Sequence, residues 1–156
     1  MAHPTNTRFA LAVHLLTLLA ETPGELIDSV VLSVSPDTNP VHVRRVLGRL
    51  RSRDLVRSQP GARGGWTLAV PADQIDLGQV WQAVNGDDPV LGLHVPDPDC
   101  PIGQVVRSNL HALDRRAAQA LVDELAQVTV ADVVADVAAG GAGGGAGGGA
   151  TRRVPS

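Results

Sequence analysis

The chain has 156 residues, and 44% of them are apolar, which suits one compact domain with additional segments. Its net charge of −3 hides a segregation: residues 40–66 hold seven arginines and one aspartate, whereas residues 67–139 hold three arginines and eleven acids. A local basic face attracts phosphate whatever the total charge, so a nucleic-acid partner is not excluded. The single cysteine, Cys100, excludes an internal disulfide. The apolar run at 10–20 is too short for a membrane span and is not led by a signal-peptide pattern, so a cytoplasmic protein is expected.

Residues 7–21 are predicted to form the first helix. Phe9, Ala12, Leu16 and Leu19 recur at spacings of three and four, which is the helical period. Further leucines line an adjoining face, so the helix is apolar around more than half its girth. We therefore expect it to pack on two sides, against its own domain and against a partner.

A helix-turn-helix is predicted next. Asp28 or Ser29 caps a short helix that runs through Val34. After a turn, Asn39 is a good N-cap and Pro40 suits the first helical position, so a third helix is expected over residues 40–53. The order helix, short helix, turn, helix is that of a DNA-binding helix-turn-helix.

A β-hairpin follows the third helix directly. Residues 55–58 and 66–69 each read as a short strand, and the glycine-rich segment 59–65 joins them. Such a hairpin in this place is a wing. Asp76 then caps a fourth helix that ends at Asn85-Gly86. Residues 1–86 are thus predicted to be a winged helix-turn-helix domain.

The rest of the chain is predicted to serve dimerisation. Residues 87–101 contain four prolines and form a sensor-type loop that holds His94 and Cys100. Residues 102–138 are dimerisation helices: a long helix to about Val128, and a short one at 130–137 capped by Thr129. The Gly/Ala-rich residues 139–156 are predicted to be a flexible tail. The apolar stripe of the long helix comprises Ile102, Val106, Leu110, Leu113, Ala117, Ala120, Leu121 and Leu125.

The third helix separates its faces. If its apolar residues point inward, Arg45 points outward, with Arg44 on one flank and His42, Arg49 and Arg53 on the other. Arginine near the start of such a helix can read guanine in the major groove, and the later arginines can hold phosphates. Arg63 at the wing tip can reach a minor groove or phosphates. The fold class is therefore mainly α with a small β-hairpin: a winged helix-turn-helix plus a long C-terminal dimerisation helix.

Two motifs resemble the Rrf2 family of bacterial winged-helix transcription regulators. They are Asn39-Pro-Val-His-Val-Arg-Arg and Gly64-Gly-Trp-Thr-Leu, and the similarity runs from about Arg8 to Val137. The resemblance implies that bases are read from Asn39, His42, Arg44 and Arg45. The family's wing commonly has Arg-Gly where this chain has Pro60-Gly61, and Arg63 offers a replacement.

The resemblance also raises the question of a cofactor. Cluster-binding members carry three cysteines in the loop before the dimer helix, and this loop has only Cys100. Iron–sulfur clusters need several thiolate ligands, so no cofactor and no metal are expected. A cluster-sensing regulator in which His94, Asp97 and Asp99 replace cysteines is the alternative. Cys100 itself is a redox-sensing thiol at a helix N-cap, an inert loop residue or a ligand.

The leading interpretation is a DNA-binding transcription repressor that binds a pseudo-palindromic operator as a homodimer and responds to redox change through Cys100. A winged-helix module that binds a protein partner is the first rival. An enzyme is not expected, because the sequence contains no phosphate loop, metal-ligand spacing, nucleophile elbow or paired catalytic carboxylates.

Overall fold

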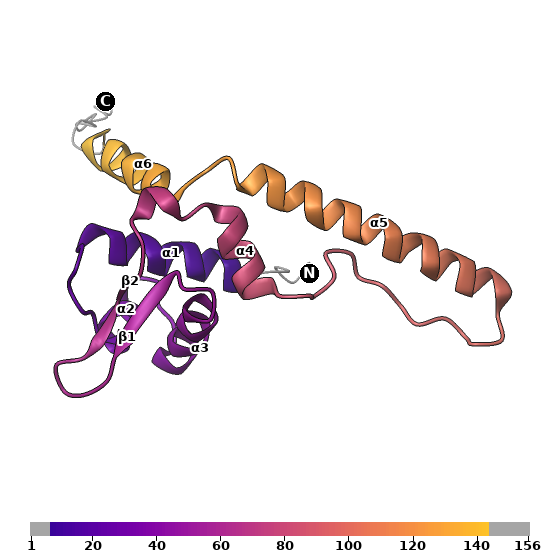
Figure 1. The fold of residues 1–156 in the computed structure, drawn as a ribbon, viewed down its shortest axis with the longest axis horizontal. Coiled ribbons are helices and arrows are strands. Elements are labelled where there is room, and N and C mark those ends of the chain that lie inside the picture. The colour runs from indigo at the N-terminus through magenta and orange to yellow at the C-terminus, as the bar shows by residue number, and fades with distance from the viewer. Residues whose placement is uncertain (1–6, 144–156) are drawn as a thin grey trace, which may run out of the picture.

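The computed structural model describes residues 7–143 and shows a mainly helical chain with one hairpin (Figure 1). The winged part contains α1 (Thr7–Glu21), α2 (Ser29–Val34), α3 (Pro40–Arg51), β1 (Val56–Gln59) and β2 (Gly65–Leu68). The 3₁₀ turn η1 (Ala72–Gln74), α4 (Leu77–Asn85), α5 (Pro101–Leu125) and α6 (Val130–Gly143) follow. This is the winged helix-turn-helix architecture with a long C-terminal helix that the sequence predicted.

Local cap chemistry sets where the helices begin. Asp28 and Asn39 each accept a hydrogen bond from the backbone N–H two residues further on, at 2.7 and 2.8 Å. Asp76 and Gln79 form a reciprocal capping box at the start of α4. Each cap satisfies a backbone donor that has no partner inside its helix, which is why the sequence placed these starts correctly.

Helix α1 lies at the centre of the core. Ala12, Leu15 and Leu16 are fully buried, and the helix contacts α3, α4, α6 and β2. The expected packing of α1 against its own domain is confirmed, and α6 of the same chain covers a further side of the helix. The expected contact of α1 with a partner stays a prediction. Helix α6 also contacts η1 and buries Val130 completely. Helix α6 therefore packs against the winged-helix body and does not continue α5.

The hairpin is held on both edges of β2. Val56 pairs with Leu68 and Gln59 with Gly65 in antiparallel register. On the other edge, Ile27 and Trp66 exchange two backbone hydrogen bonds of 2.9 and 3.0 Å. A Cβ at Gly65, whose φ is +156°, would lie 2.8 Å from the backbone of Ile27, so only glycine permits this approach. The wing is thereby fixed to the segment that precedes α2.

Several boundaries differ from the sequence prediction. Helix α3 ends at Arg51 rather than near Arg53, and α5 ends at Leu125 rather than near Val128. Both strands are shifted by one residue. Helix α6 continues to Gly143, so part of the segment predicted as a tail from residue 139 is helical, and residues 144–156 lie outside the described residues. Glycine and alanine runs lack apolar periodicity, which is why the continuation was missed.

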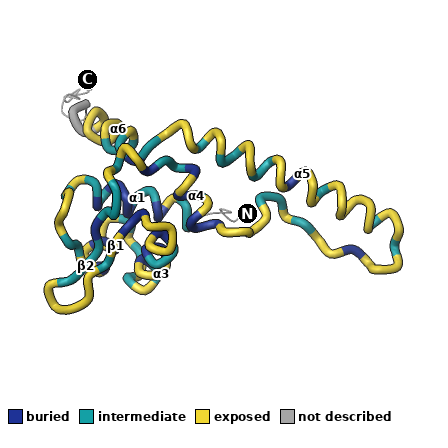
Figure 2. Tube along the Cα trace, in the orientation of Figure 1, coloured by how far each residue is buried: buried dark blue, intermediate teal, exposed yellow. Residues whose placement is uncertain are grey.

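Helix α5 projects from the compact body (Figure 1). Its C-terminal half contacts α4, while its N-terminal half extends beyond the body and is mostly exposed (Figure 2). The segment between α4 and α5 runs back along the helix, where the carboxylate of Asp114 accepts a 2.7 Å hydrogen bond from the backbone N–H of Leu91. Among the described residues 7–143, the projecting half therefore has only this loop beside it.

Candidate nucleic-acid interface

Helix α3 has one buried and one exposed side, as the sequence predicted. Val43, Val46, Leu47 and Leu50 are at most 1% exposed and form part of the core. Arg45 lies on the opposite side and is exposed. Its guanidinium is therefore available to a groove of DNA, with no side chain of the core beside it.

The start of α3 is hydrogen-bonded to α2, and one of its residues lines a small cavity. Nη1 of Arg44 donates a 3.0 Å hydrogen bond to Oγ of Ser29, although Arg44 as a whole stays exposed. Asn39 is exposed, and its side chain is used as the N-cap. His42 is half-buried and lines a cavity of about 340 Å³ together with His14 of α1. Of the four residues predicted to read bases, Asn39, Arg44 and Arg45 are thus exposed and His42 is half-buried.

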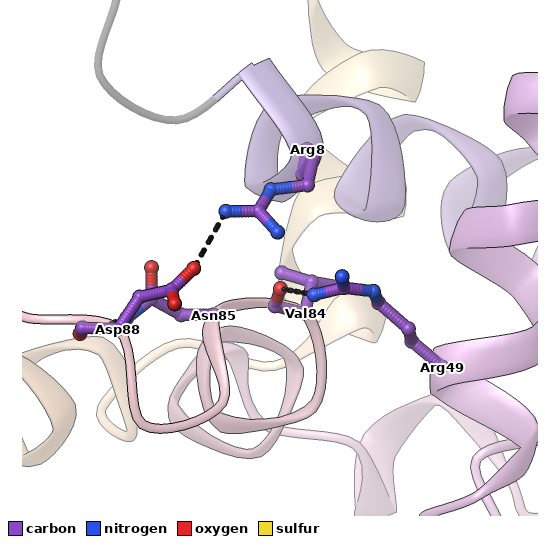
Figure 3. Close-up of polar contacts among 5 residues, drawn as sticks. All are labelled: Arg8, Arg49, Val84, Asn85 and Asp88. Carbon is purple, nitrogen blue, oxygen red and sulfur yellow. Dashed lines mark hydrogen bonds and ion pairs between the residues drawn. The ribbon is translucent and has the colours of Figure 1, made fainter.

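Arg49 is placed differently from the other predicted DNA-binding residues. It is half-buried, and its Nη1 donates a 2.6 Å hydrogen bond to the backbone carbonyl of Val84 in the last turn of α4 (Figure 3). The sequence placed Arg49 on a flank of the DNA-binding face. In the structure its guanidinium instead joins α3 to α4.

Arg51 is a wing contact that sequence reasoning missed. Its Nη1 donates a 2.8 Å hydrogen bond to Oγ of Ser58 on β1, and its guanidinium carbon lies 5.6 Å from the ring centroid of Trp66 on β2. A cation over an indole ring is attracted by the ring quadrupole. The only signal in the sequence was an arginine at the helix end with a tryptophan in the following hairpin. This contact fixes the wing relative to the recognition helix.

The remaining arginines of this region are exposed. Arg53 lies in the turn after α3, Arg57 on β1 and Arg63 at the wing tip. Together with Arg44 and Arg45 they form what we call the exposed arginines, which come from α3, the turn and the wing. Arg51 is exposed as well but is not included, because its guanidinium lies over the Trp66 ring. Asp54 is the one acid within residues 40–66, so this surface attracts phosphate.

The predicted sensor residues lie at the start of α5. Cys100 is the N-cap, as the sequence predicted, and its half-buried Sγ accepts a 3.3 Å hydrogen bond from the backbone N–H of Gly103. His94 is exposed, and within residues 7–143 no hydrogen bond joins it to Cys100. The thiol is thus integrated into the first turn of the helix that projects from the body.

The fold and its exposed arginines define a DNA-binding transcription regulator of the winged helix-turn-helix class. The sequence model of the Rrf2 family, which is described as "Iron-dependent Transcriptional regulator", matches residues 5–136. The chain belongs to the Rrf2 family, as its motifs suggested.

Known proteins agree with this assignment. YwnA of Bacillus subtilis (strain 168), named as an HTH-type transcriptional regulator, is 33% identical over 129 residues, which are 82% of this chain and 95% of YwnA. A solved structure described as a DNA-binding protein is 30% identical, with a TM-score of 0.65, and the match covers 81% of this chain and 98% of that one. CymR (YrzC), the global cysteine regulator of B. subtilis, shares the fold with a TM-score of 0.60 at 18% identity, over 86% of this chain and 98% of CymR. YwnA and CymR are both named as regulators. Within residues 7–143, no helix has both the length and the apolar character that crossing a membrane requires.

The family description names iron, but the side chains of this protein are not those that an iron–sulfur cluster needs. Iron–sulfur clusters are held by several cysteine thiolates, and this chain has only Cys100. Within residues 7–143, no group of three or more histidine, cysteine, aspartate or glutamate side chains is arranged to hold a metal ion. The residues of one chain therefore do not fit a cysteine-held cluster.

Proposed function

We propose that the protein is a repressor that binds a pseudo-palindromic operator as a homodimer. The observation that carries this proposal is the projecting half of α5, where Ile102, Val105, Val106 and Leu113 are 76, 62, 41 and 49% exposed. Ile102, Val106 and Leu113 lie on one side of the helix by its 3.6-residue repeat. An apolar stripe that residues 7–143 leave uncovered favours packing against a second copy, which two-fold symmetry then completes.

Dimerisation gives the exposed arginines two half-sites to read. In this proposal Arg45 and Arg44 contact bases from the start of α3, while Arg53 and Arg63 hold phosphates or enter the minor groove. A dimer that covers a promoter excludes the polymerase, so repression by occlusion needs no further module. Because the partner is chromosomal DNA, the proposed place of action is the cytoplasm.

The proposal extends to regulation through Cys100. Its Sγ caps the first turn of α5. Hydrogen peroxide can oxidise this thiol to a sulfenic acid with release of water, and the sulfenic acid can condense with a small thiol or with Cys100 of a second copy to give a disulfide and a further water. Either product would disturb the hydrogen bond from the N–H of Gly103. Since α5 spaces the two recognition helices, a change at its start alters the fit of the dimer to the operator. We also propose that the protein works without a metal or iron–sulfur cofactor, on the basis of its single thiol.

Footprinting on the protein's own promoter, with binding measured across a salt series, tests the DNA-binding part. A steep fall in affinity with salt and protection of two half-sites supports the proposal. Weak, sequence-independent binding would favour the rival in which α3 contacts an acidic protein. For the cofactor, anaerobic purification followed by visible absorption and iron analysis is decisive, because a coloured, iron-containing sample would contradict the cofactor-free proposal.

A further inference from the structure

The junction of α3 with the end of α4 contains a charged hydrogen bond that the DNA-reading face does not use. From it we infer that Arg49 is a positioning residue, which fixes the recognition helix to α4 and thereby sets the spacing of the two half-sites. The inference rests on the proposed homodimer, since spacing is defined only when two recognition helices act together.

The contact itself explains why Arg49 stays in place. Val84 is fully buried, and its carbonyl belongs to the last turn of α4, where carbonyls have no donor within the helix. Arg49 supplies that donor at 2.6 Å, and the positive guanidinium also suits the negative end of the helix dipole. Moving Arg49 to a phosphate would leave the buried carbonyl without a partner, which is unfavourable.

The same end of α4 is tied to the segment that leads to α5. Nδ2 of Asn85 donates a 2.8 Å hydrogen bond to the backbone carbonyl of Asp88. The carboxylate of Asp88 forms a 2.9 Å ion pair with Nη2 of Arg8 on α1. Figure 3 shows Arg8 and Arg49 approaching this short stretch from two different helices. The end of α4 is thus a junction of the recognition helix, α1 and the loop before the dimer helix.

This junction lies on the path from α3 to the dimer helix. Helix α4 contacts both α3 and α5, so the direction of α3 relative to α5 depends on how α3 is held against α4. Two half-sites of such a dimer lie about 34–36 Å apart, one turn of DNA, and both helices must meet their grooves together. Without the Arg49 contact, α3 rocks against α4 and tolerates half-sites at other separations.

The test uses the full-length protein and the two matched variants Arg49→Gln and Arg53→Gln, each of which removes one arginine charge near the end of the recognition helix. The probes are the duplex that the wild type enriches from a random library and two versions with one base pair added or removed between its half-sites. Thermal denaturation first establishes that each variant is folded. Dissociation constants are then measured for the three duplexes across a salt series.

For Arg49→Gln we expect the ratio of affinities for the correct and the altered spacing to fall about tenfold. This is the change in an equilibrium constant that corresponds to the loss of one hydrogen bond from a charged donor. Its slope of log affinity against log salt stays that of the wild type, because no phosphate contact is lost. For Arg53→Gln we expect the spacing preference to stay and the slope to weaken by about 0.9 for each phosphate contact removed.

The inference is wrong if Arg49→Gln weakens the salt slope and keeps the spacing preference, because Arg49 would then be a phosphate ligand. If Arg49→Gln does not fold, Arg49→Met decides, because methionine keeps a long aliphatic stem and cannot donate a hydrogen bond to the carbonyl of Val84. A relaxed spacing preference in Arg49→Met supports positioning, and an unchanged one overturns it. Failure of the wild type to enrich any duplex with two half-sites overturns the dimeric function itself, which is a different result from either variant's.

Discussion

Leu113→Asp tests the proposed dimer most directly. Leu113 is 49% exposed on the projecting half of α5, so about half of its side chain remains to be covered. Full burial of a leucine contributes about 1.5–3 kcal/mol, so covering the exposed half contributes about 1 kcal/mol in each subunit and about 2 kcal/mol in a dimer. Since about 1.4 kcal/mol is a factor of ten, losing this packing alone raises the dimer dissociation constant roughly 30-fold. An unpaired carboxylate in the seam adds several kcal/mol more, so we expect a monomer.

Sedimentation velocity over a range of protein concentrations measures this change, and binding to the enriched duplex reports its consequence. Ser108→Asp is the matched control, because Ser108 is an exposed residue of α5 that lies on a different side of the helix from Leu113. It introduces the same charge at an exposed position of the same helix, and its loss of helix propensity is smaller than that of Leu113→Asp. We expect the control to remain dimeric. If Leu113→Asp also remains dimeric, another surface joins the subunits and the argument from the stripe is wrong.

Three further predictions concern the reading face, the thiol and the last helix. Arg45→Ala should weaken specific binding by about 1–3 kcal/mol and relax one operator position, which a selection experiment on random duplexes would reveal or refute. Diamide should weaken operator binding of the wild type and leave Cys100→Ser unaffected; equal release of both proteins would show that the thiol is not the sensor. Hydrogen bonds from the backbone N–H and the side chain of Thr129 lower the pKa of Asp132 in the folded state. The stabilisation that Asp132 gives is therefore present above the ordinary carboxyl range and is lost as pH falls below about 4, so melting temperatures of wild type and Asp132→Asn should converge in acid. A difference that stays constant with pH would contradict this reasoning.

Much of the fold could be predicted because it depends on interactions between residues that are close in the sequence. The caps Asp28, Asn39 and Asp76 each act on backbone groups within three residues, so their effect does not depend on the rest of the chain. The same is true of Cys100 at the start of α5. The outward direction of Arg45 follows from helical periodicity alone, once the apolar residues of α3 define its buried side.

The arginines show where such reasoning stops. Sequence spacing placed Arg49 and Arg53 on the same flank of α3, yet Arg49 binds the carbonyl of Val84 and Arg53 is exposed. Arg51 is held by Ser58 and Trp66 of the wing. A guanidinium sits on a long side chain, so its partner depends on which element comes within reach. That is set by the packing of α4 and the hairpin, not by the residues beside the arginine.

The sequence by itself determined the order of the elements, most of the helix starts and the apolar stripe of α5, because these depend on periodicity and on backbone groups close in the chain. The tertiary structure decided which surfaces each element covers. It placed α6 on α1, left the N-terminal half of α5 projecting, and divided the arginines between structural contacts and an exposed set. The physical reason is that an apolar face specifies burial without specifying a partner, since the hydrophobic effect has no direction. Which surface each apolar face covers is therefore decided only when all the helices pack together around the same core.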